Sequence, residues 1–224
     1  MTHFSRLFAA EVPVPGLGFA LFLAVLLPLS TFGQVKDHLN VSAGAGFSVP
    51  TERAGSNLNT GWNFDLRGGY NATERLLLDL DFTYNRSNLN RAALARVGQP
   101  GGHATMWSLT FNPMYRFFPQ HRTDVYVTGG YGLYYRNVSL TQPVTGVAFF
   151  CDPFFGFCEP VLATLNQVVA SFTTYKGGFN AGTGLEFRVG SGRWKVFSEA
   201  RYSRMFTTHG DDLTLIPVTF GIRW

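Results

Sequence analysis

The stretch Ile216–Trp224, with the sequence IPVTFGIRW, decides the fold. Its even-numbered residues are bulky and apolar, whereas Thr219, Gly221 and Arg223 between them are small or polar. Because successive side chains of a strand point to opposite faces, this period predicts a β-strand that lies between two different environments. A chain end frays unless something holds it, and pairing with the first strand of a closed barrel would do so. The rest of the chain should then repeat the alternation in an even number of segments.

Seven further segments show the same period. They are residues 39–47, 62–70, 76–85, 107–117, 125–136, 179–189 and 194–203. The composition agrees with strands, since charged residues make up 14% of the chain, aromatic residues 16%, and there are 25 glycines. The sequence therefore predicts an all-β fold, an eight-stranded antiparallel up-and-down barrel. Pro113 interrupts the fourth segment, where we expect a β-bulge.

The connections between these segments alternate in length. Those after the second, fourth and sixth segments are short (71–75, 119–122 and 190–193), and the others are longer. The longest is an irregular region expected over 137–174. Short turns on one rim and long loops on the other are typical of a transmembrane barrel in the bacterial outer membrane, where the turns face the periplasm.

Alternation alone does not say which face points outward. A soluble, secreted barrel would turn its apolar face inward around a ligand. Aromatic residues at the ends of the segments favour the membrane arrangement, because they form girdles at the two interfaces. These residues are Trp62, Tyr70, Tyr84, Trp107, Tyr115, Tyr135, Trp194, Tyr202 and Trp224.

Charges inside a narrow barrel need partners, since a lone buried ion is costly. The expected strand pairing places Arg67 opposite Asp79 or Asp81, and it brings Arg188 near Glu199 and Glu186 near Arg201. The predicted ion-pair network of the lumen comprises Arg67, Asp79, Asp81, Arg116, Glu186, Arg188, Glu199 and Arg201. An eight-stranded barrel is narrow enough to be filled by its own side chains, so we interpret the network as a plug. A conduction path is the alternative.

Cys151 and Cys158 lie in the longest connection, and after export they would form a disulfide. No histidine accompanies them, so no metal site is expected. The region is also unusually apolar, and exposed apolar patches often mark contact surfaces. The candidate contact residues are Phe149, Phe150, Phe154, Phe155 and Phe157. Packing of these rings onto neighbouring loops is the alternative.

The chain begins with a predicted secretory signal peptide over residues 1–33, followed by the barrel over 34–224. Arg6 precedes the apolar stretch from Gly16 to Ser30, and small residues at Thr31 and Gly33 offer a cleavage site before Gln34. An uncleaved anchor helix is the alternative. Lys and Arg are scattered, so a net charge of +4 indicates no nucleic-acid surface.

With these features the chain resembles the small outer-membrane β-barrels of the OmpA and OmpX type. The resemblance covers Gln34 to Trp224 and implies location in the outer membrane and contact with its lipid. Phe220, Ile222 and Trp224 resemble the C-terminal insertion signal that the barrel assembly machinery reads. We expect a non-enzymatic barrel without a cofactor, whose long loops contact an extracellular ligand.

Two other functions stay open at this stage. One is a narrow channel for small or apolar solutes. The other is a lipid-modifying enzyme that would use His103 or His209 in the long loops.

Overall fold

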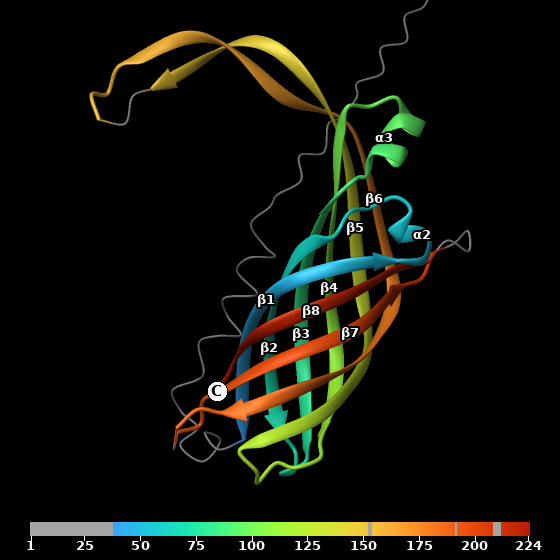
Figure 1. The fold of residues 1–224 in the computed structure, drawn as a ribbon, viewed down its shortest axis with the longest axis vertical. Coiled ribbons are helices and arrows are strands. Elements are labelled where there is room, and N and C mark those ends of the chain that lie inside the picture. Colours follow the sequence, from blue (N-terminus) through green and yellow to red (C-terminus); the bar gives the residue numbers. More distant parts are fainter. Residues whose placement is uncertain (1–37, 152–153, 191, 208–211) are drawn as a thin grey trace, which may run out of the picture. The chain divides into compact units, whose positions relative to one another are not determined.

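The computed structural model describes residues 38–151, 154–190, 192–207 and 212–224. Eight strands and two short helices make up this part of the chain (Figure 1). The elements are β1 (Leu39–Thr51), α2 (Glu52–Gly55), β2 (Gly61–Asn71), β3 (Leu76–Asn88), α3 (Arg91–Val97), β4 (Gly101–Arg116), β5 (Thr123–Cys151), β6 (Cys158–Arg188), β7 (Lys195–Met205) and β8 (Leu213–Arg223). The predicted eight-stranded fold is confirmed.

The strands form a closed barrel in which each strand pairs antiparallel with its neighbour in sequence. β8 closes the ring against β1, with Ile222 opposite Ala43. Beyond the last strand residue, the Trp224 amide donates to the carbonyl oxygen of Val41 at 2.8 Å, and the Val41 amide donates to Trp224 at 2.9 Å. The end of the chain is thus held by backbone hydrogen bonds to the first strand.

The barrel is polar inside and apolar outside. Asp65 and Asp81 on the inner face are 2% and 0% exposed, whereas Leu66 and Phe111 on the outer face are 51% and 52% exposed. A soluble barrel would show the reverse, because apolar surface is buried away from water. The outer face therefore suits the hydrocarbon of a membrane, and a closed barrel pairs its backbone groups within the sheet, as a membrane span requires.

Aromatic rings contact one another on the outer face at the end of the barrel that carries the longer loops. Trp107 lies 5.1 Å from Tyr135 between ring centroids, and Tyr135 lies 4.8 Å from Tyr175. Trp62 and Tyr84 continue the row, with centroids 5.3 Å apart. On β4, Tyr115 at the other end comes eight residues after Trp107, a spacing that matches the 9–11 residues of a tilted transmembrane strand. The row marks the extracellular interface.

The bulge predicted at Pro113 is wrong. β3 keeps one register along β4, with Leu78 opposite Pro113, and the pairs Phe111–Tyr131 and Met114–Thr128 show that β5 keeps its register too. The ladder of paired residues between β4 and β5 is interrupted between these two pairs, without a change of register. Proline has no N–H to donate, so a gap in the ladder is enough and no extra residue is inserted.

The irregular region predicted over 137–174 is also wrong. β5 and β6 continue through it as a two-stranded ribbon that ends at the pair Cys151–Cys158, with one register shift between Leu140 and Thr141. In Figure 1 the ribbon leaves the upper end of the barrel and arches to one side. Its outer part has apolar residues on both faces, which hides the period that revealed the other strands.

Candidate functional site: the lumen and the extracellular ribbon

A closed ring of four ion-paired side chains crosses the lumen. Arg67 of β2 contacts Asp81 of β3 at 3.3 Å and Glu199 of β7 at 2.8 Å. Arg201 of β7 contacts the same two carboxylates, at 2.5 Å from Asp81 and 2.6 Å from Glu199. Opposite charges therefore alternate around the ring, and all four side chains are buried. Because β7 lies across the barrel from β2 and β3, the ring spans the lumen instead of lining one wall.

Two more side chains attach to this ring. Asp65 is ion-paired with Arg67, two residues along β2. The Tyr126 hydroxyl of β5 donates to Glu199 at 2.9 Å. Tyr126 reaches Glu199 because its ring lies over Gly184 on β6, where a Cβ atom would collide with the phenol. A glycine on the inner face thus positions a tyrosine of the neighbouring strand.

A second charged group lies nearer the periplasmic turns. Glu186 of β6 pairs with Arg223 of β8, and Lys195 of β7 donates to Glu186 at 2.7 Å. The Arg223 guanidinium also lies over two rings, 5.4 Å from the centroid of Tyr126 and 5.3 Å from that of Phe197. Such contacts between a cation and an aromatic face are attractive when both are desolvated.

The structure brings Arg67, Asp81, Glu199 and Arg201 into one ring and places the other four predicted residues elsewhere. Glu186 belongs to the second group instead of pairing with Arg201. Asp79 is buried without a hydrogen-bond partner for either carboxylate oxygen among the described residues.

Arg116 and Arg188 make their side-chain hydrogen bonds outside the two charged groups. Arg116 donates to the side chain of Asn71, and Arg188 donates to the carbonyl oxygen of Pro119 at 3.2 Å. Arg188 does not make the predicted contact with Glu199 because of the register between β6 and β7. Arg188 pairs with Lys195, four residues along β7 from Glu199, so it is too far toward the turn for the predicted contact.

A cluster of buried apolar side chains, which we call the apolar cluster, lies at the extracellular end of the barrel. Its members are Ala54, Met106, Tyr134, Met205, Leu213 and Leu215, with Leu58 packed against them. Most of them occupy inward-facing positions where strands reach the longer loops, and Ala54 of α2 adds to the cluster from the β1–β2 loop. We did not predict this cluster, although apolar residues at inward-facing positions of the strand ends are visible in the sequence.

Carboxylates tie the extracellular rim together. Glu52 accepts hydrogen bonds from Thr214 at 3.1 Å and from the Tyr202 hydroxyl at 3.4 Å. Beyond the end of β7, the Thr207 amide donates to Asp212 at 2.9 Å, and Arg204 contacts the same carboxylate at 2.7 Å. The Thr207 hydrogen bond and the Arg204 guanidinium lower the pKa of Asp212.

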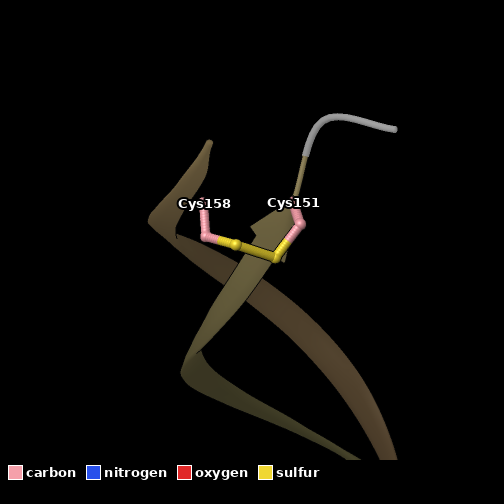
Figure 2. The surroundings of a disulfide bond; sticks show 2 residues. All are labelled: Cys151 and Cys158. Carbon is pink, nitrogen blue, oxygen red and sulfur yellow. A yellow bond between two sulfur atoms is a disulfide. The ribbon is translucent and has the colours of Figure 1, made fainter. Parts of the chain in front are cut away.

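The tip of the ribbon carries a disulfide between Cys151 and Cys158 (Figure 2). Around it, Phe149 is 73% exposed, Phe154 is 89% exposed and Phe155 is 81% exposed, while Phe157 is 54% exposed. These rings give the tip of the ribbon an apolar surface. The side chain of Phe150 lies outside the described part of the structure, as do His209 and the predicted signal peptide.

The C-terminal residues Phe220, Ile222 and Trp224 all lie on the outer face, with 54%, 50% and 37% of their surfaces exposed. His103, the other histidine considered for an enzyme, lies at the extracellular end of β4 opposite Ser139. In the described part of the chain, no group of three or more histidine, cysteine or acidic residues is placed to hold a metal ion. Within the same residues, no helix is long and apolar enough to cross a membrane.

A closed barrel with a lipid-facing apolar wall, aromatic girdle and charged interior defines a transmembrane β-barrel. Residues 19–223 match the family model described as the outer membrane protein beta-barrel domain. The chain belongs to this family, and it is a protein of the bacterial outer membrane.

Solved structures show the same fold. Neisserial surface protein A is 15% identical with a TM-score of 0.54, over 83% of this chain and 95% of that one. Ail, the attachment invasion locus protein of Yersinia pestis, is 16% identical with a TM-score of 0.50, over 84% and 98%. A major outer membrane protein from Thermus thermophilus is 10% identical with a TM-score of 0.51, over 83% and 97%. No curated protein matches the sequence.

Proposed function

We propose that the chain is a non-enzymatic outer-membrane barrel with a closed lumen, and that its extracellular ribbon makes its contacts with other molecules. The observation that carries the closed lumen is the ring of Arg67, Glu199, Arg201 and Asp81, which joins opposite walls of the barrel. The apolar cluster adds a second barrier toward the outside. An ion would have to disrupt the ring and also cross an apolar layer, where it would lose its hydration.

Conductance in planar lipid bilayers tests this proposal. Insertion is verified first on detergent gels, where a folded barrel migrates differently before and after boiling. We expect the inserted protein to give no discrete conductance steps. A variant that removes both barriers, Arg67→Ser/Glu199→Ser with Met205→Ser/Leu215→Ser, should conduct and serves as the positive control. Discrete steps from the unmodified protein would overturn the closed lumen and favour the narrow channel.

The contact role of the ribbon is supported by the exposed rings of Phe149, Phe154, Phe155 and Phe157 at its tip. Adherence of intact bacteria to polystyrene provides a direct probe of this apolar tip. We expect the variant Phe154→Ser/Phe155→Ser/Phe157→Ser to reduce adherence several-fold at equal surface amounts of barrel. Equal adherence of the two proteins would refute a contact role for the tip.

During biogenesis, we further propose, Phe220, Ile222 and Trp224 act as the insertion signal for the barrel assembly machinery. Their exposure on the lipid face of the final strand supports this role.

A further inference from the structure

A groove on the outer wall of the barrel lies where β3, β4 and β5 approach the periplasmic turns. Its volume is about 160 Å³, and it is lined by Leu76, Pro113, Met114, Tyr115, Val127, Thr128 and Gly129. The outward-facing members of this set are apolar, apart from the hydroxyl of Tyr115. One water molecule takes up about 30 Å³, so the groove is large enough for a longer apolar group.

The groove arises where a proline faces a glycine. β4 and β5 keep one register on both sides of Pro113 and Gly129, which places these two residues opposite each other. Pro113 has no N–H to donate to the carbonyl oxygen of Gly129, so the ladder loses one hydrogen bond. Gly129 brings no side chain, and a Cβ atom at this position would meet no atom closer than 3.4 Å. Proline is unusual here, because a closed barrel has no free edge to accommodate it.

A cation and a hydroxyl lie together at the periplasmic end of the groove. Arg75 directly precedes β3, and its Nη1 atom donates to the Tyr115 hydroxyl at 3.3 Å. Tyr115 also contacts Phe117 edge to face, with ring centroids 5.3 Å apart, and aromatic residues of this kind mark a membrane interface. Within the described part of the chain Arg75 belongs to no ion pair. The neighbouring carboxylate of Glu74 instead accepts from Gln120 at 3.2 Å.

We propose that this groove binds one phospholipid of the periplasmic leaflet, with an acyl chain along Pro113 and Gly129 and the phosphate on Arg75 and Tyr115. The outer wall of a transmembrane barrel faces acyl chains, and a guanidinium forms strong hydrogen bonds with a phosphate. The groove is apolar toward the middle of the membrane and basic at the interface, which is the order of the chemical groups along a phospholipid. An apolar side chain of another protein would fill the groove but leave Arg75 without a partner of opposite charge.

The site lies on the outer wall, so it depends neither on a closed lumen nor on the contacts of the ribbon. Native mass spectrometry of the purified, delipidated full chain in detergent tests it, with dioleoyl phosphatidylglycerol as the probe. We expect one tightly held lipid per barrel. Gly129→Leu should weaken this binding about tenfold, because the leucine side chain fills the groove. The matched control is Gly68→Leu on the outer face of β2, where a Cβ atom meets nothing within 4 Å, and it should leave binding unchanged.

A second variant separates recognition of the phosphate from contact with the acyl chain. Arg75→Gln should weaken binding of phosphatidylglycerol several-fold, because it removes the charged donor. It should leave binding of dioleoylglycerol, which has no phosphate, unchanged. Arg122→Gln removes a charge from another turn at the same rim, where the guanidinium lies over the ring of Phe187, and serves as the control.

Different migration on detergent gels before and after boiling establishes that each variant keeps its barrel. The proposal fails if the unmodified chain retains no phospholipid, or if Gly129→Leu binds it as well as Gly68→Leu does. Equal binding of phosphatidylglycerol and dioleoylglycerol to the unmodified chain would overturn the role of Arg75. A dimer that Gly129→Leu abolishes would assign the groove to a second protein and refute the lipid site.

Discussion

Arg67 on β2 and Glu199 on β7 meet across the lumen in a two-point ion pair. The Nη1 atom of Arg67 donates to Oε2 at 2.8 Å, and its Nη2 atom donates to Oε1 at 3.0 Å. The fork of a guanidinium matches a carboxylate in this geometry, so the pair fixes orientation as well as charge. It joins strands that are distant in sequence and lie on opposite sides of the barrel.

Removal of Glu199 should be the most damaging single change in the lumen. Glu199→Ala leaves Arg67 and Arg201 buried with excess positive charge, and we expect a loss of roughly 3–5 kcal/mol of unfolding free energy. Urea unfolding from phospholipid vesicles, followed by tryptophan fluorescence, measures this loss. Ser198→Ala, next to it on the outer face, is the control and should change stability little.

A double variant shows whether the ring acts as a unit. Glu199→Ala/Arg201→Ala removes one charge of each sign, so it should destabilise less than the sum of the two single changes, because neighbouring members of one network do not add independently. Additive losses would mean that the four side chains form separate pairs and not a ring.

Gly184 should resist substitution because Tyr126 occupies the space of its missing side chain. Gly184→Ala would displace the phenol from Glu199, and overpacking of this kind costs about 1–3 kcal/mol. Gly68→Ala is the matched control, since a Cβ atom there meets nothing within 4 Å. The same unfolding assay compares them, and equal effects would show that Tyr126 is not held by Gly184.

The disulfide should stabilise the ribbon and not the barrel. Cys151 and Cys158 are seven residues apart, and closing so short a loop contributes about 2–3 kcal/mol to local stability. The variant Cys151→Ser/Cys158→Ser should therefore still migrate differently on detergent gels before and after boiling, because its barrel is intact. Protease should cut it faster within the ribbon. Reduction of the unmodified protein should give the same cleavage. Equal cleavage rates with and without the disulfide would show that the ribbon is held by its strand pairing alone.

The sequence predicted the barrel well because each membrane-spanning strand lies between lipid and a polar lumen. That difference forces a period of two, from which β1 to β4 and the inner parts of β5 to β8 could be located. The outer ribbon meets the same surroundings on both faces, so residues such as Val144 and Val147 follow no period and the strands were missed. The helices α2 and α3 are too short to show a period, although Asn90 caps α3 and Gly98 ends it with φ of 65°.

The lumen was predicted only in part. The contact between Arg67 and Asp81 follows from the register across a short turn, since the two residues are directly paired. The contact between Arg67 and Glu199 depends on the tilt and stagger that bring distant strands together in a closed barrel, and no local pattern contains that information. The apolar cluster depends on the same geometry, because Met106 and Leu215 come from strands far apart in sequence.

Trp224 offers a last test, which separates two roles of the chain end. Its backbone hydrogen bonds to Val41 close the barrel, whereas its side chain on the lipid face would serve recognition during insertion. Trp224→Phe keeps the backbone bonds and an aromatic ring. The outer membrane should therefore contain nearly normal amounts of folded protein, recognised by its different migration on detergent gels before and after boiling. Trp224→Ser keeps the backbone but removes the ring, and we expect insertion to fall several-fold. The purified Trp224→Ser protein should nevertheless refold in detergent, since closure of the barrel depends on the backbone. If Trp224→Ser inserted in cells as well as the unmodified chain, Trp224 would have no part in the insertion signal.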